Sequence, residues 1–211
     1  MKAFLLAAAA LALPLAAMAQ SGPGTYILVD NRTVTYNGNL EIFDRGLTSK
    51  EGKGKKKVWQ ASEVYWARVG THRYLPVGGF QVPAGLLLKK VEHGLAEVLD
   101  SGRVALLRYD YTVGGPMPSG PQGNFASYSN TVSTYLLQVP TEENTLVIPM
   151  SRLSGKGSEF REMLAPYFSS RPDLVAQLQK GDVSRRNLAA FVHAYNTKQP
   201  FVAKPEDADK E

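Results

Sequence analysis

The stretch from residue 25 to residue 150 consists of short apolar runs separated by turn-forming residues. The runs are rich in Val, Thr, Tyr and Leu and partly alternate apolar with polar positions, which is typical of strands with one buried face. We expect turns at Asn37-Gly38, at Gly70-Thr71, at Asp100-Ser101-Gly102 with Gly102 left-handed, and at the polar residues Thr141 to Asn144. Successive hairpins give antiparallel neighbours, so the sequence predicts an antiparallel β-meander or a partly closed sheet.

The run RVALLRYDY, residues 103–111, predicts how one of these strands is oriented. Alternation places one set of four residues on one face and the other set on the opposite face. The first set is Val104, Leu106, Arg108 and Asp110, and the second is Ala105, Leu107, Tyr109 and Tyr111. We expect the second set to face the core.

Residues 113–130 are rich in Gly, Pro and Ser and interrupt the strand pattern. This composition predicts a long loop. A long loop inside a compact domain is either functional or without fixed structure. We favour a mobile loop, and a functional role for residues 113–130 stays open.

The apolar period changes to that of helices after Met150. Ser158 is expected to cap a helix that runs to Phe168 and is kinked or shortened near Pro166. Pro172 begins a second helix that Gly181 ends, and Ser184 caps a third. The expected apolar stripes are Phe160, Leu164, Phe168, Leu188, Phe191 and Tyr195. Strands followed by about three short helices give the α+β class.

The first 19 residues have the pattern of a secretory signal peptide. Lys2 precedes an apolar run that ends at Pro14, and Ala17-Met18-Ala19 supplies small residues for cleavage. The apolar run is shorter than the roughly 20 residues of a spanning helix, which argues against a membrane anchor. We therefore predict export to the periplasm or beyond the cell. We also predict one α+β domain over residues 20–200, β-rich at 24–150 and helical at 156–197, and a charged disordered tail over 201–211.

A run of lysines explains the basic balance of the chain. The formal net charge is +5, and removing Lys2 leaves +4. Residues 49–57 carry five Lys and one Glu, which is also +4, so the rest of the expected mature chain is neutral. A nucleic-acid-binding protein usually spreads its cations over a face. We expect a solvated loop that ends near Val58, with Lys53, Lys55, Lys56 and Lys57 as candidate contacts to an anionic polymer.

Aromatic residues cluster just after the lysine run. Exposed aromatic side chains on a sheet can stack against sugars, whereas buried ones fill the core. The candidate aromatic binding surface consists of Trp59, Tyr65, Trp66 and Tyr74. The sequence leaves open whether these rings bind a ligand or fill the core, and we favour the core.

The sequence contains no motif for catalysis, for a metal or for a cofactor. The chain has no cysteine, which rules out disulfides and thiol chemistry. His72, His93 and His193 have no neighbouring His or Cys at ligand spacing. No G-x-S-x-G elbow occurs, and Gly155-Lys156-Gly157-Ser158 lacks the first glycine of a phosphate loop. We therefore predict no catalytic residue, no metal ligand and no cofactor.

Three regions of the chain resemble a family of secreted proteins from Bacteroidetes-type bacteria for which no activity is known. The N-terminal part is similar at Thr33-Val34, Gly38 and Leu40, and the middle part at ASEV (61–64), YWARVG (65–70), HRYLPVGGF (72–80) and GRVALLRYDY (102–111). The C-terminal part is similar at Phe160, Leu164, Tyr167-Phe168, Pro172, Leu174, Leu178, Leu188, Phe191-Val192 and Tyr195-Asn196. The resemblance implies secretion but no function. It does not include the lysine run or residues 113–130.

The export pattern and the missing catalytic motifs together favour one class of function. We expect a non-enzymatic envelope or secreted protein that binds a partner or serves as an accessory subunit. The expected partners are an envelope polysaccharide, a lipid surface or an envelope protein, and not nucleic acid. The alternative is a hydrolase or other enzyme whose site is dispersed along the sequence.

Overall fold

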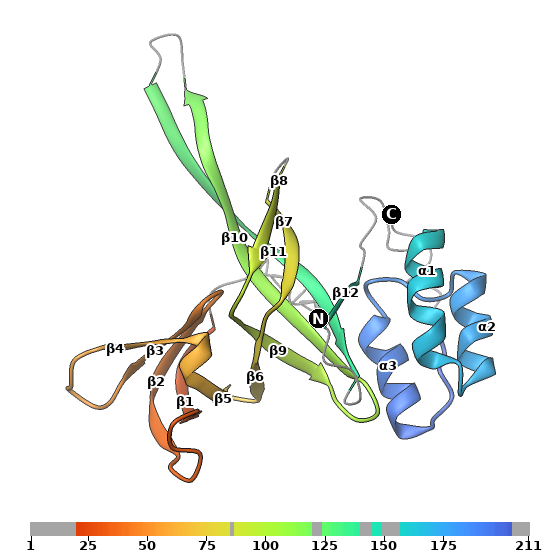
Figure 1. Cartoon of the computed structure of the whole chain (residues 1–211), viewed down its shortest axis with the longest axis horizontal. Helices are drawn as coiled ribbons and strands as arrows, with labels where there is room; N and C mark the ends of the chain where they lie inside the picture. The colour runs from red at the N-terminus through yellow and green to blue at the C-terminus, as the bar shows by residue number, and fades with distance from the viewer. Residues whose placement is uncertain (1–19, 85–86, 120–123, 140–144, 149–156, 204–211) are drawn as a thin grey trace, which may run out of the picture.

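The computed structural model describes residues 20–84, 87–119, 124–139, 145–148 and 157–203, without the side chains of residues 115–128. Within this part, ten strands form one antiparallel sheet in the order β12-β11-β10-β9-β6-β5-β1-β2-β3-β4 (Figure 1). The sheet is open, so the prediction of an antiparallel α+β fold is confirmed and closure is absent. The expected signal peptide, the turn from Thr141 to Asn144 and residues 204–211 of the expected tail lie outside the described residues.

The strands and helices are numbered in the order in which they occur along the chain. The strands of the large sheet are β1 Ser21–Leu28, β2 Tyr36–Phe43, β3 Gly46–Lys50, β4 Lys57–Gln60, β5 Val64–Val69, β6 His72–Val77, β9 Gly94–Asp100, β10 Ala105–Ser119, β11 Asn124–Gln138 and β12 Leu146–Ile148. A separate hairpin of β7 Phe80–Ala84 and β8 Leu87–Val91 lies between β6 and β9 in the chain. A short 3-10 helix, η1 Ala61–Glu63, precedes β5, and the helices are α1 Ser158–Leu164, η2 Ala165–Phe168, α2 Pro172–Lys180 and α3 Leu188–Thr197.

Some expected turns are confirmed and others are wrong. Gly70 has φ 57° in the turn between β5 and β6, as expected for a glycine-first turn. Asn37 and Gly38 instead lie inside β2, where they pair with β1, and the β1–β2 connection comes earlier in the chain. Gly102 lies between β9 and β10 as expected but is not left-handed. Propensity misplaced the first turn because long-range pairing decides a strand's register.

Residues 113–130 are largely strand and not the long loop that their composition predicted. The pairing of β10 with β11 runs from Ala105 opposite Gln138 to Ser119 opposite Asn124. In Figure 1 this hairpin extends well beyond the body of the sheet. Each strand has the other as a partner along its whole length, which overrides the weak strand propensity of Gly, Pro and Ser.

Both faces of β10 are buried, whereas one core side was expected. Leu106, opposite Leu137, packs with residues of the three helices. Leu107, opposite Leu136, packs with Val82 and other residues of the β7–β8 hairpin. The helices therefore cover one face of the central strands and β7–β8 covers the other. A third apolar cluster fills the N-terminal part of the sheet around Tyr26 and Leu47.

The helices begin and end close to their expected positions. The expected stripe residues Phe160, Leu164, Phe168, Leu188, Phe191 and Tyr195 all lie in one cluster with β10–β12. Gly181 ends α2 with φ 83°, a conformation that glycine adopts without steric cost. Ser158 is the first residue of α1 and not its cap, and α1 changes to a 3-10 helix at Ala165, just before Pro166.

Two details at the C-terminal end differ from the expectation. Asn187, and not Ser184, is the residue that precedes α3. Its Oδ1 accepts a hydrogen bond of 2.7 Å from the Ser184 backbone nitrogen, which ties the two residues together before the helix begins. Phe201, placed in the expected tail, is buried against Phe191 with ring centroids 5.3 Å apart. The folded part of the chain therefore extends to at least residue 201.

Candidate functional site

The turn between β2 and β3, residues Asp44 and Arg45, packs against the middle of the sheet. The Leu95 backbone nitrogen on β9 donates a hydrogen bond of 3.2 Å to the Asp44 carbonyl. A Cβ atom on Gly94 would lie 3.0 Å from that carbonyl oxygen and 2.6 Å from Cε2 of Tyr109. Only glycine at position 94 allows both approaches, so this residue brings the Asp44–Arg45 turn next to the ring of Tyr109.

The β7–β8 hairpin forms the second wall of the same region. Phe80 meets the Tyr109 ring edge to face, with centroids 5.4 Å apart at 86°. The Tyr111 hydroxyl donates a hydrogen bond of 2.9 Å to the Pro83 carbonyl. Val82 and Val91 belong to this hairpin and are buried. These contacts hold the hairpin on β10 from Phe80 as far as Pro83, close to its end.

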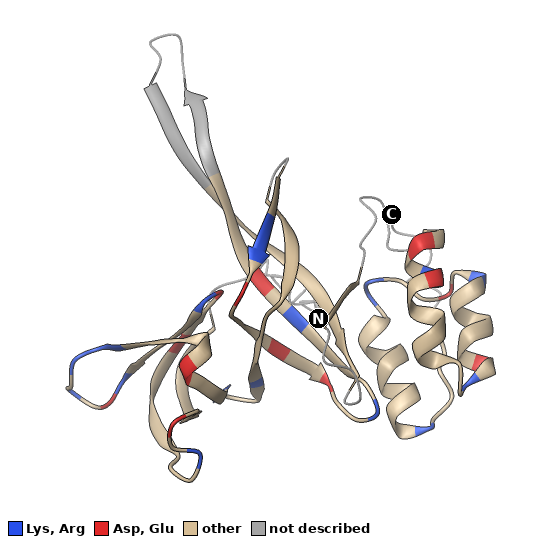
Figure 2. Cartoon of the chain, in the orientation of Figure 1, with Lys and Arg blue, Asp and Glu red and all other residues tan. Residues whose placement is uncertain are grey.

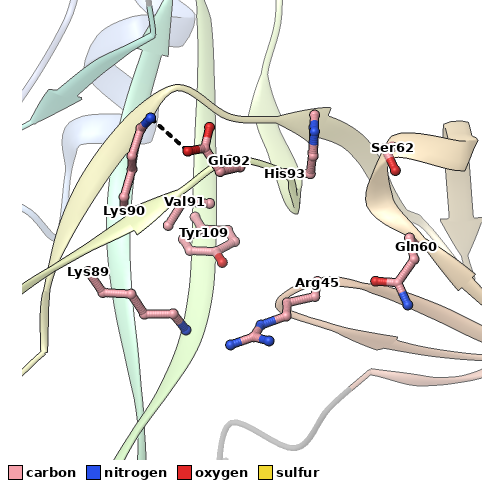
Figure 3. Close-up of a pocket in the computed structure, with 9 residues that line it drawn as sticks. All are labelled: Arg45, Gln60, Ser62, Lys89, Lys90, Val91, Glu92, His93 and Tyr109. Atoms are coloured by element: carbon pink, nitrogen blue, oxygen red, sulfur yellow. Dashed lines mark ion pairs between the residues drawn. The ribbon is translucent and has the colours of Figure 1, made fainter.

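A cavity of about 320 Å³ lies between the hairpin, the Asp44–Arg45 turn and η1 (Figure 3). Its lining residues are Arg45, Gln60, Ser62, Lys89, Lys90, Val91, Glu92, His93 and Tyr109. Figure 3 shows the Arg45 guanidinium, the Lys89 ammonium and the Tyr109 hydroxyl directed toward one region of this cavity. Each group comes from a different segment, so the tertiary fold brings them together.

The three converging groups are hydrogen-bond donors with few competing partners. Burial, together with the negative charge of Asp44, raises the pKa of Tyr109 well above its ordinary value, so its hydroxyl keeps its proton at neutral pH. Within the described residues, neither this hydroxyl nor the Arg45 guanidinium makes a hydrogen bond or an ion pair. Lys89 Nζ lies 3.3 Å from Asp44 Oδ2, so part of its charge is already compensated.

The charges around the cavity favour an anion. The lining contains three cations, Arg45, Lys89 and Lys90, and one carboxylate, Glu92, which gives +2 with His93 neutral. Lys90 and Glu92 pair with each other at 2.6 Å and are both exposed. Counting Asp44 as well leaves +1. Arginine and lysine together supply the directional donors and the point charge that phosphates and carboxylates accept.

The lysine run lies at the opposite end of the β3–β4 hairpin from this cavity. In Figure 2, the cations at this end of the hairpin lie far from the centre of the molecule. Residues 51–58 are all exposed, as predicted for a solvated loop, and β4 begins at Lys57, next to the expected Val58. Lys56 Nζ binds Glu41 Oε2 at 2.9 Å, and this hydrogen bond lowers the pKa of Glu41. The mobility of the loop and its contacts to a polymer stay predictions.

The four candidate aromatic residues do not form one surface. Tyr74 is buried, with 6% of its surface exposed, which removes it from any binding face. Trp59 is half-buried, packs at a tilt on Tyr26 and donates its ring N–H to Ser49 Oγ at 3.2 Å. Tyr65 is 43% exposed, but Arg32 covers its ring at 4.6 Å. Trp66 is half-buried and lies opposite Ile27, where the register between β1 and β5 shifts.

A polar network on the sheet joins residues that looked unrelated in the sequence. Glu97 accepts from His72 Nδ1 and from Arg108 Nη2, each at 2.5 Å. Arg108 Nε lies 3.3 Å from Asp110 Oδ2 without forming a hydrogen bond, and Ser133 donates to Asp110 at 2.5 Å. Cross-strand pairing explains the alignment, because Glu97 lies opposite both Tyr74 and Arg108. The arrangement fixes the His72 ring through one nitrogen.

Among the residues that the structure describes, no three or more His, Cys, Asp or Glu side chains are placed to hold a metal ion. The same part of the chain contains no helix of the length and apolar character needed to cross a membrane. No family model, curated protein or solved structure matches the chain. The resemblance to the secreted Bacteroidetes-type family therefore stays a prediction.

The cavity could not be predicted from the sequence, because its donors are far apart along the chain. Arg45 and Lys89 are separated by 44 positions, and neither belongs to a motif. Tyr109 was assigned to the core, which is correct for its ring but not for its hydroxyl. The only local signal was Gly94 after the sequence Glu92-His93, which marks a turn but indicates no ligand.

Proposed function

We propose that this chain is an exported, non-enzymatic protein that binds an acidic envelope molecule through the cavity beside Tyr109. The ligand carries a phosphate or a carboxylate, which Arg45, Lys89 and the Tyr109 hydroxyl hold together. Export rests on the signal-peptide pattern of the first 19 residues. The convergence of these three donors on one cavity is the observation that carries the proposal.

The geometry supports binding because the fold holds two of the three donors in place. Donors that are held in place before a ligand arrives lose little entropy when it binds. Tyr109 is fixed by Phe80 and Gly94, and Lys89 lies on a paired strand. Arg45 is exposed, so it can reach the ligand from the solvent side. The arrangement contains no oriented nucleophile, which favours binding over catalysis.

The test is calorimetric titration of the mature protein with inorganic phosphate, glycerol phosphate and a uronic-acid oligosaccharide. We expect Arg45→Ala and Tyr109→Phe each to weaken binding by about tenfold or more, because each removes a charge-assisted hydrogen bond. Arg73→Ala and Tyr65→Phe are the matched controls, since both side chains are exposed and lie outside the cavity lining. Absence of binding to all three probes, or equal loss in the controls, would refute the proposal.

The enzyme alternative has one observation in its favour. His72 is oriented by Glu97 and its side chain is 45% exposed, an arrangement that suits a general base. If the chain is a hydrolase, His72→Ala should abolish turnover in a panel of chromogenic esters, phosphates and glycosides. Arg45→Ala should then leave that turnover intact. The same two variants therefore separate the enzyme from the binding protein.

A further inference from the structure

Two arginines lie directly opposite each other on β5 and β6, and neither has a partner. Arg68 pairs with Arg73 in the register of these strands. Both side chains are exposed, and within the described residues neither makes a hydrogen bond, an ion pair or a ring contact. In Figure 2 the cations of β5 and β6 lie close together. Like charges directly opposite each other destabilise a sheet, so the fold gains no stability from this pair.

The strands around this pair contain no carboxylate that compensates its charge. β1, β5 and β6 have no Asp or Glu. Across the sheet, Arg68 lies opposite Thr25 on β1, which lies opposite Asn37 on β2, and both of these residues are uncharged. Arg108 and Arg171, by contrast, each bind a carboxylate. The two adjacent guanidiniums on β5 and β6 are therefore available to an external acidic group.

The arginine pair points away from the apolar cluster that fills the N-terminal part of the sheet. Ala67 precedes Arg68, and Tyr74 follows Arg73. Ala67 and Tyr74 lie opposite each other and are buried in that cluster. Successive side chains of a strand point to opposite faces, so the two arginines lie on the outer face of β5 and β6.

A row of apolar side chains lies beside the pair on the same outer face. Trp66 on β5 and Leu75 on β6 are each two positions from one of the arginines, and side chains two positions apart share a face. Trp66 lies opposite Ile27, and Leu75 lies opposite Ala96. Ala96 is buried in the cluster beneath the β7–β8 hairpin, whereas Ile27, Trp66 and Leu75 are only half-buried. The row therefore continues from a covered core onto open surface.

This surface fits an acidic protein segment better than a carbohydrate or a small anion. Trp and Arg are the side chains that most often dominate the energy of protein interfaces. Ile27 and Leu75 are aliphatic, so they do not offer the ring faces on which sugars stack. Guanidiniums hold carboxylates through directed, charge-assisted hydrogen bonds, but exposed charges alone contribute little. The fitting partner therefore combines carboxylates with apolar side chains, as a peptide does at neighbouring positions.

We propose that Arg68, Arg73 and the row of Ile27, Trp66 and Leu75 bind an acidic segment of a partner protein that also carries large apolar side chains. The arginines hold its carboxylates, and the row packs against its apolar groups. This surface shares no residue with the cavity beside Tyr109, so it is a second site. The phosphate and sugar probes of the cavity have no large apolar side chain, so Arg73→Ala remains a control for the cavity.

The experiment measures binding of a random copolymer of glutamate and tyrosine to the mature protein by calorimetry at physiological ionic strength. Polyglutamate and dextran sulfate are the comparisons, because they carry negative charge without apolar side chains. We expect the copolymer to bind at least about tenfold more tightly than either, and the Arg68→Ser, Arg73→Ser variant to lose at least about tenfold in affinity. The matched control, Arg103→Ser with Lys180→Ser, removes the same charge at exposed positions elsewhere and should bind as wild type does.

The emission of Trp66 provides a second, local measurement. The chain has two tryptophans, so Trp59→Phe leaves Trp66 as the only one. We expect the copolymer to shift the emission of this variant. The shift should disappear when Arg68 and Arg73 are also replaced by serine. Circular dichroism should show that all of these variants are folded.

The results that would overturn this inference are distinct from those that test the cavity. Wild type that binds no copolymer, or that binds dextran sulfate as tightly, would overturn it. Copolymer binding that survives both arginine substitutions would do so too, as would binding that is lost instead in Arg45→Ala or in the variant with serine at Lys53, Lys55, Lys56 and Lys57. Loss of glycerol phosphate binding in Arg45→Ala concerns the cavity alone, so each proposal can fail without the other.

Discussion

Asn196 on α3 pairs with the backbone of Val104 beside β10 as a neighbouring strand would. The Val104 nitrogen donates to Asn196 Oδ1 at 3.1 Å, and Asn196 Nδ2 donates to the Val104 carbonyl at 2.9 Å. Asn196 Nδ2 also lies 2.5 Å from Asp100 Oδ1. Gly102 allows this approach, because a Cβ atom there would lie 2.7 Å from the Asn196 side chain. One amide side chain thus joins the helical layer to the β9–β10 connection.

Replacing Asn196 by alanine should lower the free energy of unfolding by about 2–3 kcal/mol. The substitution leaves the part-buried backbone groups of Val104 without their partner, and unsatisfied groups of this kind are costly. Chemical denaturation followed by circular dichroism measures the change. Asn37→Ala, an exposed amide on β2, should stay within about 0.5 kcal/mol of wild type. Equal midpoints for the two variants would show that Asn196 does not hold the helices on the sheet.

The sequence was sufficient to predict the fold class because the strand and helix patterns agree with the tertiary packing. Gly181 and Pro172 mark the ends of α2 as their backbone preferences require. The Phe160 to Tyr195 stripes are buried as their spacing indicates. The errors occur where pairing overrides local preference. Asn37-Gly38 lies in a strand, and residues 113–119 and 124–130 pair although their composition favours a loop.

The candidate site was much less predictable. Charge patterning found the lysine run, which is exposed, but not the cation pair of Arg45 and Lys89. The sequence does not indicate which of the clustered aromatic residues are buried. Tyr74 is buried and Tyr65 is exposed, although both lie in strands with imperfect alternation. The cavity depends on where the Asp44–Arg45 turn packs, and that contact joins residues about 50 positions apart.

Glu97→Ala should destabilise the protein by about 3 kcal/mol. Glu97 is 6% exposed and neutralises Arg108, so its removal leaves a part-buried guanidinium with only the weaker contact to Asp110. Glu92→Ala is the matched control, because the Lys90–Glu92 pair is 63% exposed on both sides and such pairs contribute little. Thermal and urea unfolding of the two variants measure the difference. If both variants unfold like wild type, the Glu97 network does not stabilise the sheet.

The stability of the fold should decline above about pH 10 because of two buried tyrosines. Burial raises the pKa values of Tyr74 and Tyr109, and the negative charges of Glu97 and Asp44, respectively, add to the effect. Above the ordinary tyrosine pKa of about 10, the unfolded chain releases these protons while the folded chain keeps them. The unfolded state then binds fewer protons, so the free energy of unfolding falls by up to about 1.4 kcal/mol per pH unit for each tyrosine. Below pH 10 both states are protonated, and this contribution is fully present.

This slope is checked by measuring the urea midpoints of wild type, Tyr74→Phe and Tyr65→Phe. The measurements run from about pH 8 to about pH 11, a range around the ordinary tyrosine pKa. Tyr74→Phe should be less stable at neutral pH, because it loses the hydrogen bond to Gln20. Its decline above pH 10 should nevertheless be shallower than that of wild type. Tyr65 is 43% exposed, so Tyr65→Phe should keep the wild-type slope. Parallel curves for wild type and Tyr74→Phe would argue against a raised pKa.

Replacing Lys53, Lys55, Lys56 and Lys57 by serine should change the free energy of unfolding by little, within about 0.5 kcal/mol for each exposed position. Residues 51–58 are all exposed, and the Lys56–Glu41 pair is exposed on both sides at 62% and 46%. Exposed charges interact over a screening length of about 8 Å at physiological ionic strength, so any binding that depends on these lysines should weaken as salt is added. Vesicle or polysaccharide binding of the serine variant, measured against the Arg45→Ala variant, separates the loop from the cavity. Loss in the serine variant alone would place the anionic contact at the lysines. Loss in Arg45→Ala alone would place it in the cavity, where the Tyr109 hydroxyl completes the set of donors.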